Sequence, residues 1–152
     1  MQTQSNRISE KTEEYPLSPY ERGMYIEQRL DTSSTVYNLN IMAMIRGASS
    51  ESVKTALNSV FAAHEAFRSY YGERDGKPVR IITGCLPEIY EAAAKDIAEV
   101  IEIAENEDIP FDLTAGIPVR PTVYTLADSF VVLHMAVHHI AFDGVSEQIL
   151  HK

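Results

Sequence analysis

The most apolar segment of the chain is residues 130–137, which reads F-V-V-L-H-M-A-V. Side chains of a β-strand alternate between its two faces, and His134 is the only polar side chain on either face of this run. A strand that is apolar on both faces needs a covering layer on each side. The run therefore predicts the central strand of a sheet that helices cover.

Helical signals occur on both sides of this run. Ser18 can cap a helix over 19–30, because Pro19 fits the first helical position and Glu21 completes a capping box. Apolar residues recur at helical spacing within a second expected helix, 50–65, and a third is expected at 88–106. Charged residues on the outer face of the third helix indicate a solvated surface. A helical start is expected at 145–152.

Alternation and turn residues indicate further strands. The expected strands are 36–46, 67–74, 77–83 and 119–126. Asp75-Gly76 is a strong two-residue hairpin signal between the second and third of these, and Pro121 suggests an edge or a bulge in the fourth. The element order is then α-β-α-β-β-α-β-β-α. It predicts a mixed sheet with helices packed on it, an α/β fold arranged as an α+β-like sandwich.

Charge and cysteine content limit the partners and the compartment. The formal net charge of −9 argues against nucleic-acid binding and against a polybasic membrane surface, which both need basic residues. Cys85 is the single cysteine, so no intrachain disulfide can form. Residues 1–14 are polar and lack the apolar core of a signal peptide, so we expect a flexible tail, one domain over 15–152, no membrane span and a cytoplasmic location.

One segment carries residues suited to catalysis. It reads H-H-I-A-F-D-G-V-S from His138 to Ser146 and directly follows the apolar run. Sites are often built in loops at strand ends. A histidine there has a rigid base, and its near-neutral pKa allows it to accept a proton from an amine or a hydroxyl group.

Three other interpretations of this segment are open. The two histidines could be polar residues that end a strand. His134, His138 and His139 could bind zinc with Asp143, although His134 and His138 lie about 13 Å apart in a strand that rises roughly 3.3 Å per residue. Asp143 could orient a histidine in a Ser-His-Asp triad, but the chain has no G-x-S-x-G segment to supply the nucleophile.

The pattern H-H-x-x-x-D-G resembles the signature of condensation domains of nonribosomal peptide synthetases and of the wider chloramphenicol-acetyltransferase-like superfamily. Three more segments resemble condensation-domain motifs in the same order: L-S-P-Y-E-R-G-M-Y (17–25), H-E-A-F-R-S (64–69) and F-D-L-T-A-G-I-P-V-R (111–120). Ala63 stands where the family usually has arginine, and Ile117 takes the place of a family proline. The resemblance covers nearly all of the chain except its tail.

The resemblance implies a fold and a reaction. Condensation domains have two similar lobes with a channel between them, so residues 15–152 resemble the amino-terminal lobe, with the second lobe absent. The reaction is amide formation by an acyltransferase: an acceptor amine attacks a donor thioester, and phosphopantetheine arms of carrier proteins hold both substrates. His139 matches the catalytic position, where it would deprotonate or hold the amine and stabilise developing charge.

The same resemblance assigns supporting roles. His138 would stabilise the loop by hydrogen bonding. Asp143 would pair with an arginine, for which Arg68 is the candidate, and Gly144 would keep the loop or the substrate entry free of a side chain. Alternatively, Arg68 is a surface charge and Gly144 an ordinary turn glycine. His64 is expected in the core.

Several expectations concern partners and subtype. The expected partners are donor and acceptor carrier proteins, the second lobe and an adjacent adenylation module; no directly bound cofactor, metal, nucleic acid or membrane is expected. D-G-V-S (143–146) also resembles epimerization domains, while the opening segment favours condensation. A related acyltransferase using a coenzyme A or carrier thioester, or a noncatalytic carrier-docking fragment, is the remaining alternative. The lobe alone is expected to be inactive.

Overall fold

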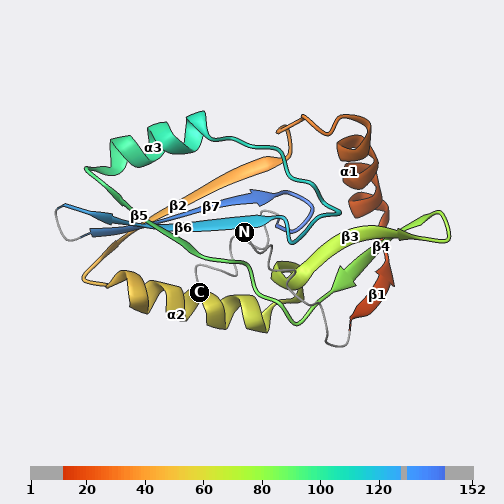
Figure 1. Ribbon diagram of the computed structural model, residues 1–152, viewed down its shortest axis with the longest axis horizontal. Coiled ribbons are helices and arrows are strands. Elements are labelled where there is room, and N and C mark those ends of the chain that lie inside the picture. Colours follow the sequence, from red (N-terminus) through yellow and green to blue (C-terminus); the bar gives the residue numbers. More distant parts are fainter. Residues whose placement is uncertain (1–11, 128–129, 143–152) are drawn as a thin grey trace, which may run out of the picture.

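The computed structural model describes residues 12–127 and 130–142 (Figure 1). Within these ranges the chain forms two sheets, helices on both faces of the larger sheet, and a helix beside the smaller one. The elements are β1 (Glu13–Pro16), α1 (Pro19–Leu30), β2 (Asn38–Arg46), α2 (Ser50–Ala63), the 3-10 helix η1 (Glu65–Arg68), β3 (Ser69–Arg74), β4 (Lys77–Ile82), β5 (Tyr90–Ala94), α3 (Ile97–Asn106), β6 (Val119–Leu126) and β7 (Phe130–His138).

The larger sheet has the strand order β2-β7-β6-β5. Strand β7 lies between β2 and β6 and is antiparallel to both, whereas β5 runs parallel to β6. The sheet is therefore mixed, as the sequence predicts. Helices α2 and α3 cover its opposite faces (Figure 1), so the prediction of a central covered strand at 130–137 is confirmed.

The alternation along β7 produces a separate core on each face of the sheet. Val131, Leu133, Met135 and Val137 pack in the core that also holds the inner face of α2. Val132 packs on the other face in a smaller core with residues of α3, β5 and β6. Because both cores bury apolar side chains of one strand, β7 is held rigidly up to its last residue.

The smaller sheet has the order β1-β4-β3, and helix α1 lies beside it (Figure 1). Asp75 and Gly76 both have positive φ, 52° and 72°, which is the backbone of the predicted two-residue hairpin turn. Strand β1 begins at Glu13, where it pairs with Ile82. The expected flexible tail, 1–14, therefore overlaps an ordered strand, and the strands form two sheets rather than one.

Helix α1 has the bounds and the cap that the sequence predicts. Ser18 Oγ accepts a hydrogen bond from the backbone N–H of Glu21 at 3.2 Å, and the Ser18 N–H donates to Glu21 Oε2 at 2.8 Å. These two bonds satisfy N–H groups that a helix start leaves unpaired. The cap thereby fixes where the helix begins relative to the smaller sheet.

The expected helix at 88–106 is wrong in its first half. Residues Tyr90–Ala94 form β5 and pair in parallel with β6, and α3 begins only at Ile97. Glutamate and alanine favour helix, but pairing with the edge of β6 outweighs this weak local preference. Asp96 marks the true start, since its side chain accepts a hydrogen bond from the Glu99 N–H at 3.0 Å.

Candidate active site

The histidine pair lies at the end of β7, where His138 contacts Gln28 of α1 and His139 contacts Tyr20 of α1. Three backbone hydrogen bonds hold the chain there: His138 N–H donates to Pro118 O at 3.0 Å, His139 N–H to Tyr37 O at 2.7 Å, and Ala141 N–H to His138 O at 2.9 Å. The strand therefore passes into a turn whose backbone groups are paired. This turn determines where each imidazole points.

His138 is fully buried and its ring nitrogens have distinct partners. Nδ1 accepts a hydrogen bond from the Ile140 N–H at 3.1 Å, so in the neutral ring Nε2 carries the proton. Nε2 lies 3.2 Å from Gln28 Oε1 and donates to it. The rings of Tyr37 and Phe111 pack against the imidazole. A supporting role for His138 in the turn stays a prediction.

The surroundings of His138 keep it neutral. Burial, and to a smaller extent the adjacent His139, lowers the pKa of its imidazole to about 4. A buried charged imidazole would lose hydration without gaining a counter-ion. At neutral pH His138 is therefore an uncharged hydrogen-bonding residue.

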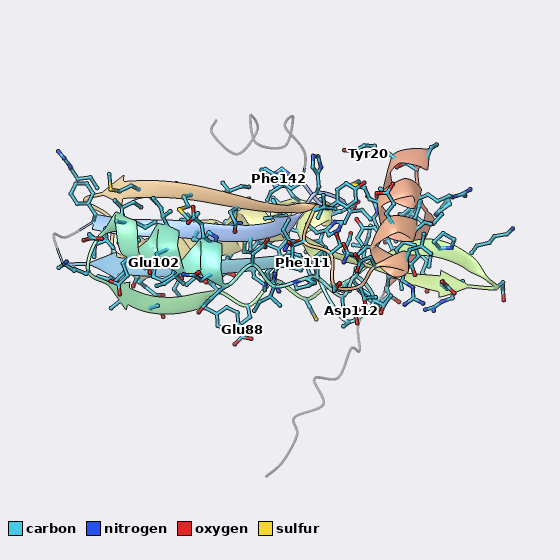
Figure 2. All side chains as sticks on the ribbon, turned by 90° about the horizontal axis from the view of Figure 1, so that it is seen from above. Tyr20, Glu88, Glu102, Phe111, Asp112 and Phe142 are labelled. Atoms are coloured by element: carbon cyan, nitrogen blue, oxygen red, sulfur yellow. The ribbon has the colours of Figure 1, made fainter. Side chains whose placement is uncertain are left out.

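His139 lies in a different environment. Its side chain is half-buried, and the ring of Tyr20 meets it edge-on at 6.2 Å between centroids. Tyr20 itself is 59% exposed, and Figure 2 shows it at the same edge of the molecule as Phe142. His139 Nδ1 is buried and has no hydrogen-bond partner among the described residues. His139 is thus partly exposed, whereas His138 is fully buried.

Arg68 lies at the end of η1, close to the segment that follows the turn. Its Nη1 donates to Thr83 O at 3.0 Å, and its Nε is buried without a partner among residues 12–127 and 130–142. The neighbouring Phe67 packs on Phe142 with ring centroids 6.0 Å apart. Arg68 is therefore half-buried and partly paired rather than a free surface charge. Its expected partner Asp143, and also Gly144, lie outside the described residues.

The zinc interpretation finds no support in the described part of the chain. His134 Nε2 lies 2.9 Å from Asn40 Oδ1, whereas His138 Nε2 is bound to Gln28 on a different element. No three His, Cys, Asp or Glu side chains come together there in a way that could hold a metal ion.

One prediction outside the motif is wrong. His64 is not in the core: it is the exposed residue that ends α2. The described residues contain no helix long and apolar enough to cross a membrane.

Two residues beside the histidines were not predicted as part of a site. Tyr20 gives no signal, since an exposed tyrosine in a first helical turn is ordinary. Gln28 does give one: it shares the buried stripe of α1 with Met24 and Tyr25. A polar residue on the apolar face of a helix requires hydrogen-bonding partners, and Gln28 finds them in Ser34 O and His138.

Comparisons with known proteins identify the family of the chain. A family model described as "Condensation domain" matches residues 11–152, and the chain belongs to that family. Over 139 residues it is 34% identical to Tyrocidine synthase 2 of Brevibacillus parabrevis. The aligned region covers 90% of this chain and 4% of that protein. The chain therefore spans a small fraction of this much longer relative.

Solved structures show the same fold. The starter condensation domain of rhizomide synthetase RzmA superposes with a TM-score of 0.81 at 21% identity, covering 91% of this chain and 36% of that one. Holo-AB3403, a four-domain nonribosomal peptide synthetase bound to AMP and glycine, gives a TM-score of 0.79 at 21% identity over 96% of this chain and 12% of that one. The chain thus corresponds to about a third of the RzmA chain.

Proposed function

We propose that this chain is the amino-terminal lobe of a condensation domain of a nonribosomal peptide synthetase and that His139 is its catalytic residue. The observation that carries the proposal is the contrast between the two histidines that end β7. His138 is fully buried and bonded at both nitrogens, whereas His139 is half-buried beside the exposed Tyr20. One ring supports the turn, and the other is available to a substrate.

The proposed reaction joins an acyl thioester to an amine. The acceptor nitrogen attacks the thioester carbonyl, a C–N bond forms and the C–S bond breaks. The nitrogen loses a proton, the departing thiolate gains one, and the products are an amide and a free thiol. His139 accepts the proton from the nitrogen as the C–N bond forms, which is the role for which an imidazole pKa suits it.

The substrates are proposed to arrive on phosphopantetheine arms of a donor and an acceptor carrier protein. A second lobe completes the channel, so the described lobe alone supplies the histidine but not the opposite wall. An adenylation module beside the domain would load the acceptor carrier, in keeping with the several domains of the synthetase to which this lobe is similar. The lobe needs no directly bound cofactor for this chemistry, since the thioester is already activated.

Arg68 and Asp143 are proposed to pair and to hold the loop that follows His139. The support is local: Arg68 has a buried Nε without a described partner, and Phe67 packs on Phe142, the residue before Asp143. A buried guanidinium favours a carboxylate partner, because an unpaired buried charge is costly. Gly144, which follows Asp143 in the sequence, is proposed to keep the loop free of a side chain.

The test is condensation between two loaded carrier proteins, measured with the full two-lobed domain that contains this chain. We expect His139→Ala to abolish product formation or lower its rate by about a hundredfold or more, as for loss of a general base. His64→Ala removes an exposed histidine of the same lobe and serves as the matched control. Equal product from His139→Ala and the wild type would refute the assignment, and acyl transfer from coenzyme A alone would support the related acyltransferase instead.

A further inference from the structure

We propose that Gln28 is a positioning residue for catalysis: it fixes the ring of His138 in one tautomer and thereby holds the turn that carries His139. The inference rests on the proposed function of His139. It joins α1 and the loop that directly follows α1 to the end of β7, 110 positions further along the chain. None of the motifs that the family resemblance uses requires a glutamine here.

The amide of Gln28 has a defined orientation. Its Nε2 group donates to Ser34 O at 3.1 Å and lies 3.5 Å from Asp31 O, both in the loop that follows α1. Because two carbonyl oxygens face the NH2 group, the Oε1 atom must point the other way, toward His138. Gln28 is 4% exposed, so water does not compete for these bonds.

The acceptor Oε1 selects the tautomer of His138. A ring with its proton on Nε2 donates to Gln28 and leaves Nδ1 free to accept from the Ile140 N–H. In a ring with its proton on Nδ1, the Nδ1–H donor would face the Ile140 N–H donor. The unprotonated Nε2, an acceptor, would face the acceptor Oε1 of Gln28. Both hydrogen bonds would be lost in a buried site, at a cost of about 1–3 kcal/mol for each unsatisfied group.

The turn connects this choice to His139. Ile140 directly follows His139, and the bond from its N–H to His138 Nδ1 closes the turn together with the bond from Ala141 N–H to His138 O. The groups that pack on His138 from other elements are the Tyr37 and Phe111 rings, and the Tyr37 hydroxyl is itself bonded to Glu27. None of them replaces Gln28 as an acceptor for Nε2–H.

The first arm of the test reads the tautomer by nitrogen NMR of the histidine rings in this chain, with no catalysis involved. We expect a single Nε2–H tautomer for His138 in the wild type and in Arg29→Leu, the matched control at the next, exposed position of α1. Gln28→Leu should give a mixture of both tautomers. An unchanged single tautomer in Gln28→Leu would overturn the proposal.

Gln28→Glu keeps an acceptor for His138, so it tests the proposal even if Gln28→Leu does not fold. Its carboxylate favours the imidazolium, so the His138 ring should protonate at a pH higher by about one unit or more than in the wild type. Protonation places a donor on Nδ1 opposite the Ile140 N–H. A His138 titration identical to that of the wild type would count against the proposal.

The second arm measures condensation in the full two-lobed domain. We expect Gln28→Leu to lower kcat about tenfold, because a loosened turn misplaces the His139 ring relative to the reacting amine, with KM for the acceptor carrier unchanged. Gln28→Glu should lose activity at acidic pH and recover it at alkaline pH, and Arg29→Leu should match the wild type. A changed tautomer with unchanged kcat would refute the positioning role, whereas full activity of His139→Ala would refute the proposed function instead.

Discussion

His138 and His139 are adjacent in the chain, yet one ring is fully buried and the other half-buried. Their positions account for part of this difference in burial, because His138 is the last residue of β7 and His139 begins the turn. The family pattern could assign the two roles from sequence. It could not identify Gln28 as the partner of His138, because that contact joins residues 110 positions apart.

The buried His138 predicts a dependence of stability on pH. Its folded pKa of about 4 lies below the ordinary value of 6.5, so the unfolded chain binds the proton more readily. Stability is therefore fully present above pH 6.5 and is lost as the pH falls toward 4, by about 3 kcal/mol at most. We expect urea unfolding at pH 4 and pH 7 to show this loss in the wild type.

The matched variant is His138→Gln, which cannot titrate. Its unfolding free energy at pH 7 should be lower than that of the wild type, but the additional loss between pH 7 and pH 4 should be smaller by about the amount attributed to His138. The same pH dependence in both proteins would contradict the account of a buried neutral imidazole.

The proposed pair of Arg68 and Asp143 makes a prediction at the same scale. In a double-mutant cycle with Arg68→Met and Asp143→Asn, we expect a coupling energy of about 1–3 kcal/mol in urea unfolding, as for residues in contact. Arg74→Met paired with Asp143→Asn is the control, because Arg74 already pairs with Glu14. Additive effects of Arg68→Met and Asp143→Asn would show that the two residues do not interact.

At the scale of elements, local signals predicted starts and turns better than they predicted strand pairing. The capping box of α1 and the Asp75-Gly76 turn were predicted because each depends on a few neighbouring residues. Strand β5 was not predicted because Y-E-A-A-A has no strand alternation. This segment is a strand because it pairs with β6. The division of the strands into two sheets likewise depends on long-range pairing.

The hairpin turn gives an element-scale prediction. Gly76 has φ +72°, and a side chain in this left-handed region costs about 1–2 kcal/mol. We therefore expect Gly76→Ala to lower the free energy of unfolding by that amount. Gly116→Ala is the control: nothing lies within 4 Å of the added Cβ and its backbone is not left-handed. Similar losses from both variants would show that the turn conformation is not the cause.

At the scale of the whole molecule, β7 is buried between two helical layers, and the half-buried His139 directly follows it. We expect this chain alone to form no amide from two loaded carriers, because the proposed channel needs a second wall. Adding the second lobe should restore activity if the two lobes associate. Amide formation by the single lobe, at the rate of the two-lobed domain, would contradict this view of the site.

In the proposed function, His139 reacts with substrates while His138 stays buried. This assignment can be tested in the unaltered two-lobed domain by treatment with diethyl pyrocarbonate, which acylates accessible neutral imidazoles, with each histidine followed by peptide mass spectrometry. We predict that loss of condensation follows modification of His139, that loaded carriers slow both, and that His138 remains unmodified. Full activity after complete modification of His139, or modification of His138 at the same rate, would contradict the account.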